Sequence, residues 1–323
     1  MSTTTLRIGT RGSELALWQA NHVAEQLRAH GHDVSVEIIR TTGDRMQDPS
    51  FRAPATFEDG SPLDAKGIFI KEIEDALAAG RIDVAVHSLK DLPATLDPRF
   101  TLAAIPLRAD PRDAFVCESF WGLHMLPMGA RIGTTSPRRK AMLLALRPDL
   151  RFVELRGNVD TRLRKWQEGQ ADALVLAAAG LDRLNRAGHV HQRFAIDELC
   201  PAPGQGALAI ETRCPRSVQD TAIHAAVAGL NCADVAFATT AERAVLNALG
   251  GGCNLPLGAF CHRVDESWHL HAMVVSPDGD QIADVIERAP QGIAAEELGQ
   301  RAAEALKARG ALELLTPLAT DPA

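Results

Sequence analysis

The first third of the chain alternates between strand-like and helix-like patterns of apolar residues. The apolar residues of 34–38 lie at every second position, which predicts a half-buried strand, and the more apolar run 82–86 predicts a strand near the middle of a sheet. Two sets at helical spacing accompany them, with Ser13 as the N-cap of the first helix and Gly80 at the end of the second. These sets are Ala20, Val23, Ala24 and Leu27, and Ile70, Ile73 and Leu77. Strands that alternate with helices predict an α/β fold with a mostly parallel sheet.

One four-residue sequence, Arg-Ile-Gly-Thr, occurs twice, at 7–10 and at 131–134. Each copy has the pattern of a short strand that leads into a helix, and each is followed later by a glycine before another strand, at Gly80 and Gly169. The shared order predicts two similar α/β domains. Because ligands of open α/β sheets bind beyond the carboxyl ends of strands, we expect the two domains to flank an active-site cleft.

The last third of the chain has a different pattern. The proline- and glycine-rich segment 201–206 predicts a crossover or hinge. A helix at 237–249, alternating strands at 268–275 and a final helix at about 294–309 predict a smaller C-terminal α+β domain. By contrast, 47–61 has prolines and little periodicity, which predicts a mobile loop.

Length and composition set the domain organisation. A chain of 323 residues is longer than a domain with a single hydrophobic core usually is. We expect a first domain at 1–106 with about 207–224, a second at 112–200 and a third at 229–323. Neither a signal peptide nor an apolar run of about 18 residues occurs, so we expect a cytoplasmic protein with no membrane partner. The six cysteines form no CxxC pairs, which predicts reduced thiols and no structural metal.

Charge is distributed unevenly. The formal net charge of -7 argues against nucleic acid as a partner, yet 131–165 holds ten Lys/Arg against Asp149, Glu154 and Asp160. This basic segment favours a small, multiply anionic ligand. A solvated basic helix face is the alternative interpretation.

The segment HSLKDLP, at 87–93, follows directly from the strand predicted at 82–86. It places Lys90 and Asp91 at the carboxyl end of that strand. A carboxylate in a cleft can stabilise a cation or move protons when its surroundings tune its pKa. A capped turn with solvated charges is the alternative, and by itself the motif does not decide between them.

Two further segments predict arginines at the start of helices. In GTTSPRR, at 133–139, Ser136 suits the N-cap and Pro137 the first helical position, so Arg138 and Arg139 lie in the first turn. Cations there oppose the helix dipole, which favours an anion site over an exposed pair of arginines. In LRGNVDTR, at 155–162, a glycine turn and an Asn158 cap repeat the design. Guanidinium groups bind carboxylates at two points. A phosphate group is the alternative ligand, although the GxxxxGK[ST] pattern of phosphate-binding loops is absent.

A fourth segment, LGGGCNLPLG at 249–258, places three glycines before Cys253. The glycines give the backbone freedom and leave the sulfur uncrowded, which favours a reactive thiolate or an attachment point. A buried cysteine in a tight turn is the alternative.

Taken together, these segments resemble the porphobilinogen deaminase family, also called hydroxymethylbilane synthases, of tetrapyrrole (haem) biosynthesis. HSLKDLP, GTTSPRR, LRGNVDTR, PAPGQGA and GGGCNLPLG stand in the family's order. The segments RIGTRGSELALWQA, at 7–20, and KGIFIKE, at 66–72, match as well, so the resemblance covers nearly the whole chain.

The resemblance implies a transferase with two domains akin to periplasmic binding proteins and a third domain that carries the cysteine. Cys253 would bear a dipyrromethane cofactor, built from two substrate molecules and held by a thioether. Four molecules of porphobilinogen would be added head to tail with loss of ammonia, and hydrolysis would release hydroxymethylbilane. The family expectation is a monomer that can pass its product to uroporphyrinogen-III synthase.

The resemblance also implies roles for single residues. Catalysis is assigned to Asp91, with Lys90 and Arg11. Cofactor binding is assigned to Cys253, Asp91, Lys90, Ser88, Thr134, Ser136, Arg138, Arg139, Arg156, Gly157 and Gln205. Substrate binding is assigned to Arg11, Ser13, Lys66, Phe69, Arg156, Arg162 and Arg183. For Phe69 a place in the helix core is an equal alternative.

Some positions depart from the family pattern. Asp64 and Ala65 replace a more usual glycine pair before Lys66, and 47–61 is longer than typical, which puts the contacts of that loop in doubt. The second function considered is a non-catalytic protein that binds small anions on the same two-domain scaffold, since a fold alone does not fix function. A third, a transcriptional regulator, lacks a helix-turn-helix segment before residue 13.

Overall fold

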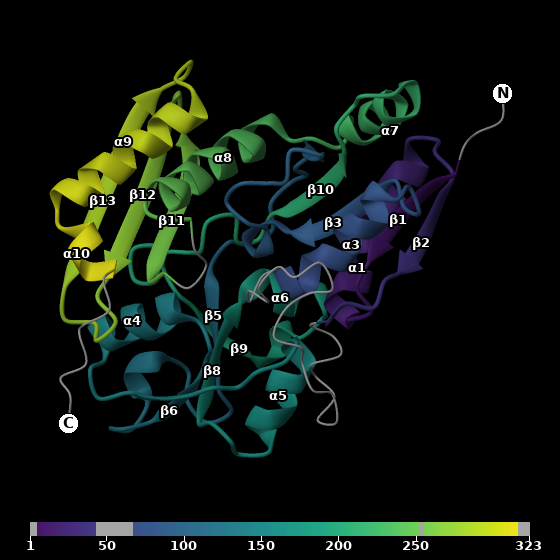
Figure 1. Cartoon of the computed structure of the whole chain (residues 1–323). Coiled ribbons are helices and arrows are strands. Elements are labelled where there is room, and N and C mark those ends of the chain that lie inside the picture. Colours follow the sequence, from purple (N-terminus) through teal and green to yellow (C-terminus); the bar gives the residue numbers. More distant parts are fainter. Residues whose placement is uncertain (1–4, 43–66, 252–254, 316–323) are drawn as a thin grey trace. The chain divides into compact units, whose positions relative to one another are not determined.

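The computed structural model describes residues 5–42, 67–251 and 255–315 of the chain (Figure 1). They belong to two compact units, of which the first comprises Met1–Arg108 and Ala207–Ala236 and the second Ala109–Gly206 and Phe237–Ala323. The loop expected at 47–61 lies outside the described residues. The three domain boundaries expected from the sequence stay a prediction.

A five-stranded sheet forms the centre of the first unit, in the order β2-β1-β3-β10-β4. β1 pairs in parallel with β2 and β3, whereas β10 is antiparallel to β3 and β4, so four strands run one way and only β10 runs the other. The strands are β1 (Leu6–Thr10), β2 (Val34–Ile38), β3 (Val84–Ser88), β4 (Phe100–Ala104) and β10 (Leu208–Arg213). The helices of this unit are α1 (Glu14–Ala29), α3 (Gly67–Ala78), the short 3-10 helix η1 (Leu89–Asp91) and α7 (Val218–Ala228).

The helices of this unit begin and pack as the apolar pattern predicts. Ser13 caps α1 by accepting a hydrogen bond from the amide of Ala16. The four apolar residues of α1 named above are fully buried against β1 and β3, and Ile73 and Leu77 of α3 are buried in a second cluster with Ala85 of β3. Each such leucine or isoleucine contributes about 1.5–3 kcal/mol by leaving water. Ile38 is the exception, because β2 is an edge strand and this side chain is 59% exposed.

The second unit contains a sheet of the same topology, in the order β7-β6-β8-β5-β9. Here β6 pairs in parallel with β7 and β8, and β5 is the reversed strand between β8 and β9. The strands are β5 (Asp113–Val116), β6 (Arg131–Gly133), β7 (Arg151–Val153), β8 (Ala173–Ala177) and β9 (Val190–Arg193). The helices around them are η2 (Leu123–Met125), α4 (Pro137–Leu146), α5 (Val159–Gln167), α6 (Ala178–Arg183) and η3 (Ala187–His189).

The two copies of Arg-Ile-Gly-Thr occupy equivalent places in the two sheets. Gly9 of β1 faces Ala85 of β3, and Gly133 of β6 faces Leu174 of β8. A Cβ atom at Gly9 would lie 2.3 Å from Cδ1 of Ile82, and one at Gly133 would lie 2.5 Å from Cδ2 of Leu174. A side chain at either place would have to displace the ends of neighbouring isoleucine or leucine side chains, and glycine avoids this. The prediction of two similar α/β sheets is confirmed.

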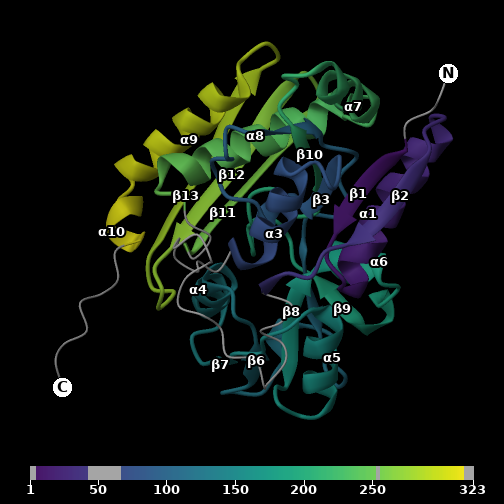
Figure 2. The same ribbon diagram turned by 45° about the vertical axis from the view of Figure 1, so that its right-hand side comes forward.

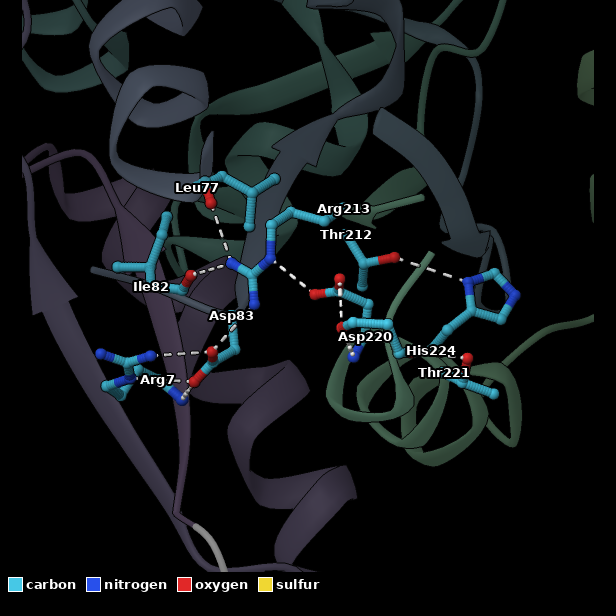
Figure 3. Close-up of polar contacts among 10 residues, drawn as sticks. Arg7, Leu77, Ile82, Asp83, Thr212, Arg213, Asp220, Thr221 and His224 are labelled. Atoms are coloured by element: carbon cyan, nitrogen blue, oxygen red, sulfur yellow. Dashed lines mark hydrogen bonds and ion pairs between the residues drawn. The ribbon is translucent and has the colours of Figure 1, made fainter. Parts of the chain in front are cut away.

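The arginine of each copy also makes the same ion pair. Arg7 binds Asp83 through Nε and Nη2, at 2.9 and 2.8 Å, and Arg131 binds Asp172 in the same two-point way, at 3.3 and 2.8 Å. In the first unit Arg213 joins the pair, at 3.3 Å from Asp83, and also binds Asp220 of α7 (Figure 3). This network fixes the starts of the central strands, at the edge away from their carboxyl ends.

The C-terminal part of the second unit is a smaller α+β assembly, as predicted. Its antiparallel sheet has the order β11-β12-β13, and α9 packs along β12 and β13 (Figure 2). Phe237 of α8 stacks on Trp268 of β12 with ring centroids 4.1 Å apart. The elements are α8 (Ala233–Ala248), β11 (Leu257–Val264), β12 (Ser267–Val275), β13 (Ile282–Pro290), α9 (Ala295–Ala308) and α10 (Ala311–Leu315).

No single helix in the described part of the chain is both long and apolar enough to cross a membrane, although the bent pair α7 and α8 together would reach the required length and hydropathy.

Candidate active site

In the first unit, the predicted catalytic residues follow the carboxyl ends of two adjacent strands. β1 ends at Thr10 and leads to Arg11, while β3 ends at Ser88 and leads to Lys90 and Asp91 in η1. Because β1 and β3 are parallel neighbours, these ends share one edge of the sheet. Asp91 is exposed there, and Lys90 and Arg11 are partly exposed. The arrangement suits a carboxylate that must meet a ligand.

The backbone of this turn is supported from the neighbouring strand and helix. The amide of Leu89 donates to the carbonyl of Ala207, just before β10, at 3.0 Å. Ser88 accepts a hydrogen bond from the buried Gln19 of α1, from Nε2 to Oγ at 2.9 Å. The family resemblance implies a cofactor-binding role for Ser88; in the structure its hydroxyl links α1 and β3, and the predicted role stays a prediction.

Directly before this turn lies a buried pair that sequence reasoning missed. His87 is 7% exposed, and its Nε2 lies 3.1 Å from Oε2 of Glu211 on β10, which is fully buried. The sequence analysis assigned roles in HSLKDLP to Ser88, Lys90 and Asp91 and none to His87. Nothing in the local sequence links His87 to a residue 124 positions away, since only the pairing of β3 with β10 brings them together.

In the second unit, the predicted anion site at the start of α4 has the expected helix geometry. Ser136 caps the helix by accepting from the amide of Arg139, and Pro137 stands at the start of the helix. Thr134 accepts from the amide of Ser136 at 3.2 Å. These contacts fix the turn between β6 and α4, so that Arg138 and Arg139 leave it in defined directions.

Both arginines are buried, which neither interpretation of the sequence foresaw. Arg138 is 4% and Arg139 6% exposed, and both contact the fully buried carboxylate of Asp113 at 2.7 Å. Arg138 also donates to the carbonyl of Cys200 at 2.6 Å. Asp113, a residue of the chain itself, is therefore one anion that these two cations bind. Two guanidinium groups thus face the single carboxylate of Asp113 in the described contacts.

Asp113 is a second residue that the sequence did not single out. It begins β5, the reversed strand, and pairs with Ala177 at the carboxyl end of β8. The start of an antiparallel strand thus reaches the edge where parallel strands end. Without the strand order, an aspartate at a strand start gives no sign of such a role.

Gln205 and Arg183 join the same edge of this sheet. Gln205 donates through Nε2 to Oδ1 of Asp113 at 3.1 Å and to the carbonyl of Pro111 at 2.7 Å. Arg183, in α6 after β8, donates to the carbonyl of Gly206 at 2.8 Å. Burial lowers the pKa of Arg183 to about 10, although the charge of Asp182 partly opposes this. Arg183 therefore stays cationic near neutral pH.

The turn between β7 and α5 is more open. Asn158 caps α5 by accepting from the amide of Thr161, as predicted, and Gly157 has a φ of 122°. Arg156 is 79% exposed and pairs with Glu154, which is 70% exposed, at 3.0 Å. An ion pair this exposed contributes little to stability. Arg162 lies half-buried in α5.

Three predicted site residues lack a described side chain. Cys253 and Lys66 lie outside the described residues, and of Phe69 only the backbone, in α3, is described. Their predicted roles stay predictions.

Family models match most of the chain in two segments. Residues 6–221 match the model described as "Porphobilinogen deaminase, dipyromethane cofactor binding domain", and residues 236–308 match "Porphobilinogen deaminase, C-terminal domain". The chain belongs to the porphobilinogen deaminase family. The predicted resemblance is confirmed, and a non-catalytic anion-binding protein is not favoured.

Curated relatives agree over most or all of the chain. A porphobilinogen deaminase of Syntrophotalea carbinolica is 44% identical over 100% of this chain and 98% of its own length. One of Roseiflexus sp. is 49% identical over 86% of this chain and 88% of its own length.

Solved structures of binding proteins are more distant. The methionine-binding protein MetQ is 12% identical, covers 69% of this chain and 89% of its own, and has a TM-score of 0.42. The periplasmic VFT2 domain of Bordetella pertussis BvgS is 14% identical, covers 74% and 90%, and has a TM-score of 0.42.

Proposed function

We propose that this chain is an active porphobilinogen deaminase that joins four porphobilinogen molecules head to tail on a primer attached to Cys253 and then releases hydroxymethylbilane by hydrolysis. In each addition the bond from the aminomethyl carbon to nitrogen breaks and ammonia leaves. A new carbon–carbon bond forms to the free ring carbon of the growing chain, which loses its proton. The single observation that carries the proposal is the family membership over the full length of the chain, with the motif residues intact.

The residues present fit a dipyrromethane. This group carries several carboxylates, and the start of α4 offers Thr134, Ser136 and two guanidinium groups against one carboxylate, Asp113. We infer that Arg138 and Arg139 hold the acidic side chains of the cofactor and that Gln205 holds Asp113 in place. When bound, the cofactor supplies the nucleophilic ring carbon for the first addition.

We infer that Asp91 performs the acid–base and electrostatic part of the reaction. Loss of ammonia and the coupling that follows pass through cationic states of the substrate pyrrole. An exposed carboxylate at a strand end can stabilise such a cation and exchange protons with the pyrrole nitrogen. Lys90 and Arg11 share that edge of the sheet and would bind the carboxylates of the incoming substrate or the primer.

The remaining arginines are proposed to accommodate the charge that accumulates with each addition. Each new ring brings an acetate and a propionate, and guanidinium groups bind carboxylates at two points. Arg183 is buried and cationic, so it would hold a carboxylate of the growing chain in one position. Arg156 is exposed and would hold one less rigidly. Arg162, with Ser13, Lys66, Phe69 and Gly157, completes the proposed binding set.

The finer biological setting is also a proposal. We infer a cytoplasmic monomer that acts on porphobilinogen and can hand its unstable linear product to uroporphyrinogen-III synthase. This follows the expectation of the family.

Intact-mass spectrometry of the purified active protein tests the proposal. We expect a mass above that of the sequence by two linked pyrrole units, and the mass of the bare chain in a Cys253→Ser variant. Release of ammonia from porphobilinogen, measured in parallel, separates the enzyme from an anion-binding protein. An active wild-type protein with an unmodified Cys253 would disprove the primer attachment, and no ammonia release from loaded protein would disprove the enzyme.

A further inference from the structure

The buried pair of His87 and Glu211 lies on the face of the first sheet that α3 covers. His87 of β3 is opposite Ala209 of β10, and Glu211 follows two residues later on the same face. Both side chains are almost completely removed from water. A charged or polar group in such a place is costly unless it is well paired, so the hydrogen bond between Nε2 and Oε2 is the main reason that this pair is tolerated.

A second carboxylate makes this environment unusual. Burial raises the pKa of Glu74, on α3, to about 7, and the charge of Glu211 raises it further while that of His87 opposes the shift. Oε1 of Glu211 is buried without a hydrogen-bond partner among the described residues. We refer to these three residues together as the His87 cluster (His87, Glu211 and Glu74).

Few other charges face the His87 cluster. The charge of Asp97 raises and that of Arg99 lowers the pKa of Glu74, and these two residues pair with each other at 2.8 Å. From α3 itself, Lys71 and Asp75 lie 4.0 Å apart. Among the described residues, His87 is the side chain that hydrogen-bonds Glu211, and no Lys or Arg side chain does so.

The His87 cluster adjoins the catalytic turn through the backbone. His87 is followed by Ser88, Leu89, Lys90 and Asp91, and the turn is anchored to the same strand that carries Glu211. Leu208 of β10 pairs with Ser88, and the amide of Leu89 donates to Ala207. A change in how His87 meets Glu211 therefore acts on the strand pairing from which Asp91 extends.

We propose that His87 and Glu211 are positioning residues for the turn that carries Lys90 and Asp91. The inference rests on the proposed function, because it assigns the pair a task in that reaction. Neither residue touches substrate: they hold β3 against β10 so that the carboxylate of Asp91 points in one direction.

Steady-state kinetics of His87 variants, loaded with cofactor as judged by intact mass, test the positioning role. His87→Leu, which removes the donor, should lower kcat about 10- to 100-fold with KM within about twofold. His87→Gln, which can still donate to Glu211, should recover most of that loss. Asp83→Asn is the matched control, because it breaks a buried ion pair at the other end of β3; it should lower thermal stability and leave kcat at the wild-type value.

Comparison of kcat with stability distinguishes positioning from mere packing. A His87→Leu variant that is less stable but keeps its kcat would overturn the inference. If His87→Leu does not fold, Glu211→Gln decides in its place: a lower kcat at normal KM supports the proposal and an unchanged kcat overturns it.

Amide hydrogen exchange tests the positioning role whether or not the proposed function is correct. In His87→Leu, or in Glu211→Gln, the amides of Leu89 and Leu92 should exchange faster than in Asp83→Asn, because their acceptors belong to the turn and its anchor. This readout needs no turnover. Unchanged exchange would contradict the inference even if the wild type releases ammonia, and faster exchange would support it even in a protein that does not.

Discussion

At the scale of single residues, the buried charges of both candidate edges are paired with partners far away in the sequence. Asp113 lies between Arg138 and Arg139, and Glu211 contacts His87. In each case a carboxylate from the reversed strand of a sheet meets side chains that follow or lie within the parallel strands. Pairing stabilises these buried groups. A buried charge without a partner would cost several kcal/mol.

Asp91 offers the simplest test of a catalytic role. Because its side chain is exposed, Asp91→Asn should leave thermal stability within error of the wild type. Loss of its acid–base and electrostatic contribution should lower kcat about 10²- to 10⁴-fold. Asp33→Asn, an exposed aspartate before β2 at the opposite edge of the same sheet, serves as control and should be fully active. Ammonia release measures both; full activity of Asp91→Asn would remove this residue from the mechanism.

Glu74 gives a stability test that does not depend on activity. Its pKa is raised from 4.5 in the unfolded chain to about 7 in the folded one, so the folded state binds more protons between these values. Its contribution to stability is therefore fully present below pH 4.5 and is lost as pH rises through 7. Glu74→Gln should consequently be more stable than the wild type at pH 8 and should lose that advantage at pH 5. Melting temperatures across this range measure it; a difference that does not depend on pH would show that Glu74 is not held neutral.

At the scale of elements, the two five-stranded sheets use the same devices. In each, a glycine of the second strand in the order, Gly9 or Gly133, admits close packing of neighbouring side chains. The arginine two residues earlier forms a two-point ion pair with an aspartate just before the central strand, Asp83 or Asp172. The pairs differ in surroundings: the side chain of Asp83 is 2% exposed, and that of Asp172 is 39% exposed. Burial opposes the shift, yet hydrogen bonds from Arg7 keep the pKa of Asp83 below its usual value.

These equivalent pairs allow a matched comparison. Asp83→Asn should destabilise the protein by about 3 kcal/mol or more, because it leaves Arg7 and Arg213 facing a buried neutral group. Asp172→Asn should change stability little, since water already solvates that pair. Apparent melting temperatures of the two variants at neutral pH give the answer. Equal losses would mean that the repeated geometry matters more than its burial.

At the scale of the whole molecule, charge separates one stretch of the chain from the rest. The protein carries a formal net charge of -7, yet 131–165 has ten basic residues against three acidic ones. Several of these basic side chains, including Arg131, Lys140 and Arg151, are exposed and add to the field around the second sheet. Such a field attracts a small anion while the overall charge repels polyanions.

The dependence of kinetics on salt follows from this distribution. Raising the salt concentration from about 0.05 to about 0.3 M shortens the Debye length and should raise KM for porphobilinogen several-fold while kcat stays constant. Arg164→Gln, which removes an exposed charge outside the proposed site, should reduce the salt dependence slightly without changing kcat. A KM that does not respond to salt would show that only the directly bound arginines matter.

The features that the sequence predicted and those that it missed differ for a physical reason. Periodicity and caps alone predicted α1, the start of α4 at Ser136 and the cap of α5 at Asn158, because these depend on contacts among residues close in the chain. The repeated Arg-Ile-Gly-Thr segment predicted the two matching sheets. The motifs alone gave the family, since short segments in a fixed order are specific. Burial of Arg138 and Arg139 was not foreseen, because the capped helix start gives no information on what covers it.

The sequence by itself predicted several helices and strands and the doubled α/β plan from local spacing and a repeated segment, and the family resemblance implied site residues whose roles stay predictions. Only the tertiary structure decided which charges meet. Strands β5 and β10 each enter a sheet against the direction of their neighbours, and this reversal brings Asp113 and Glu211 to groups 25 to 124 positions away. Pairing of distant strands depends on the free energy of the whole folded sheet, which no local pattern records.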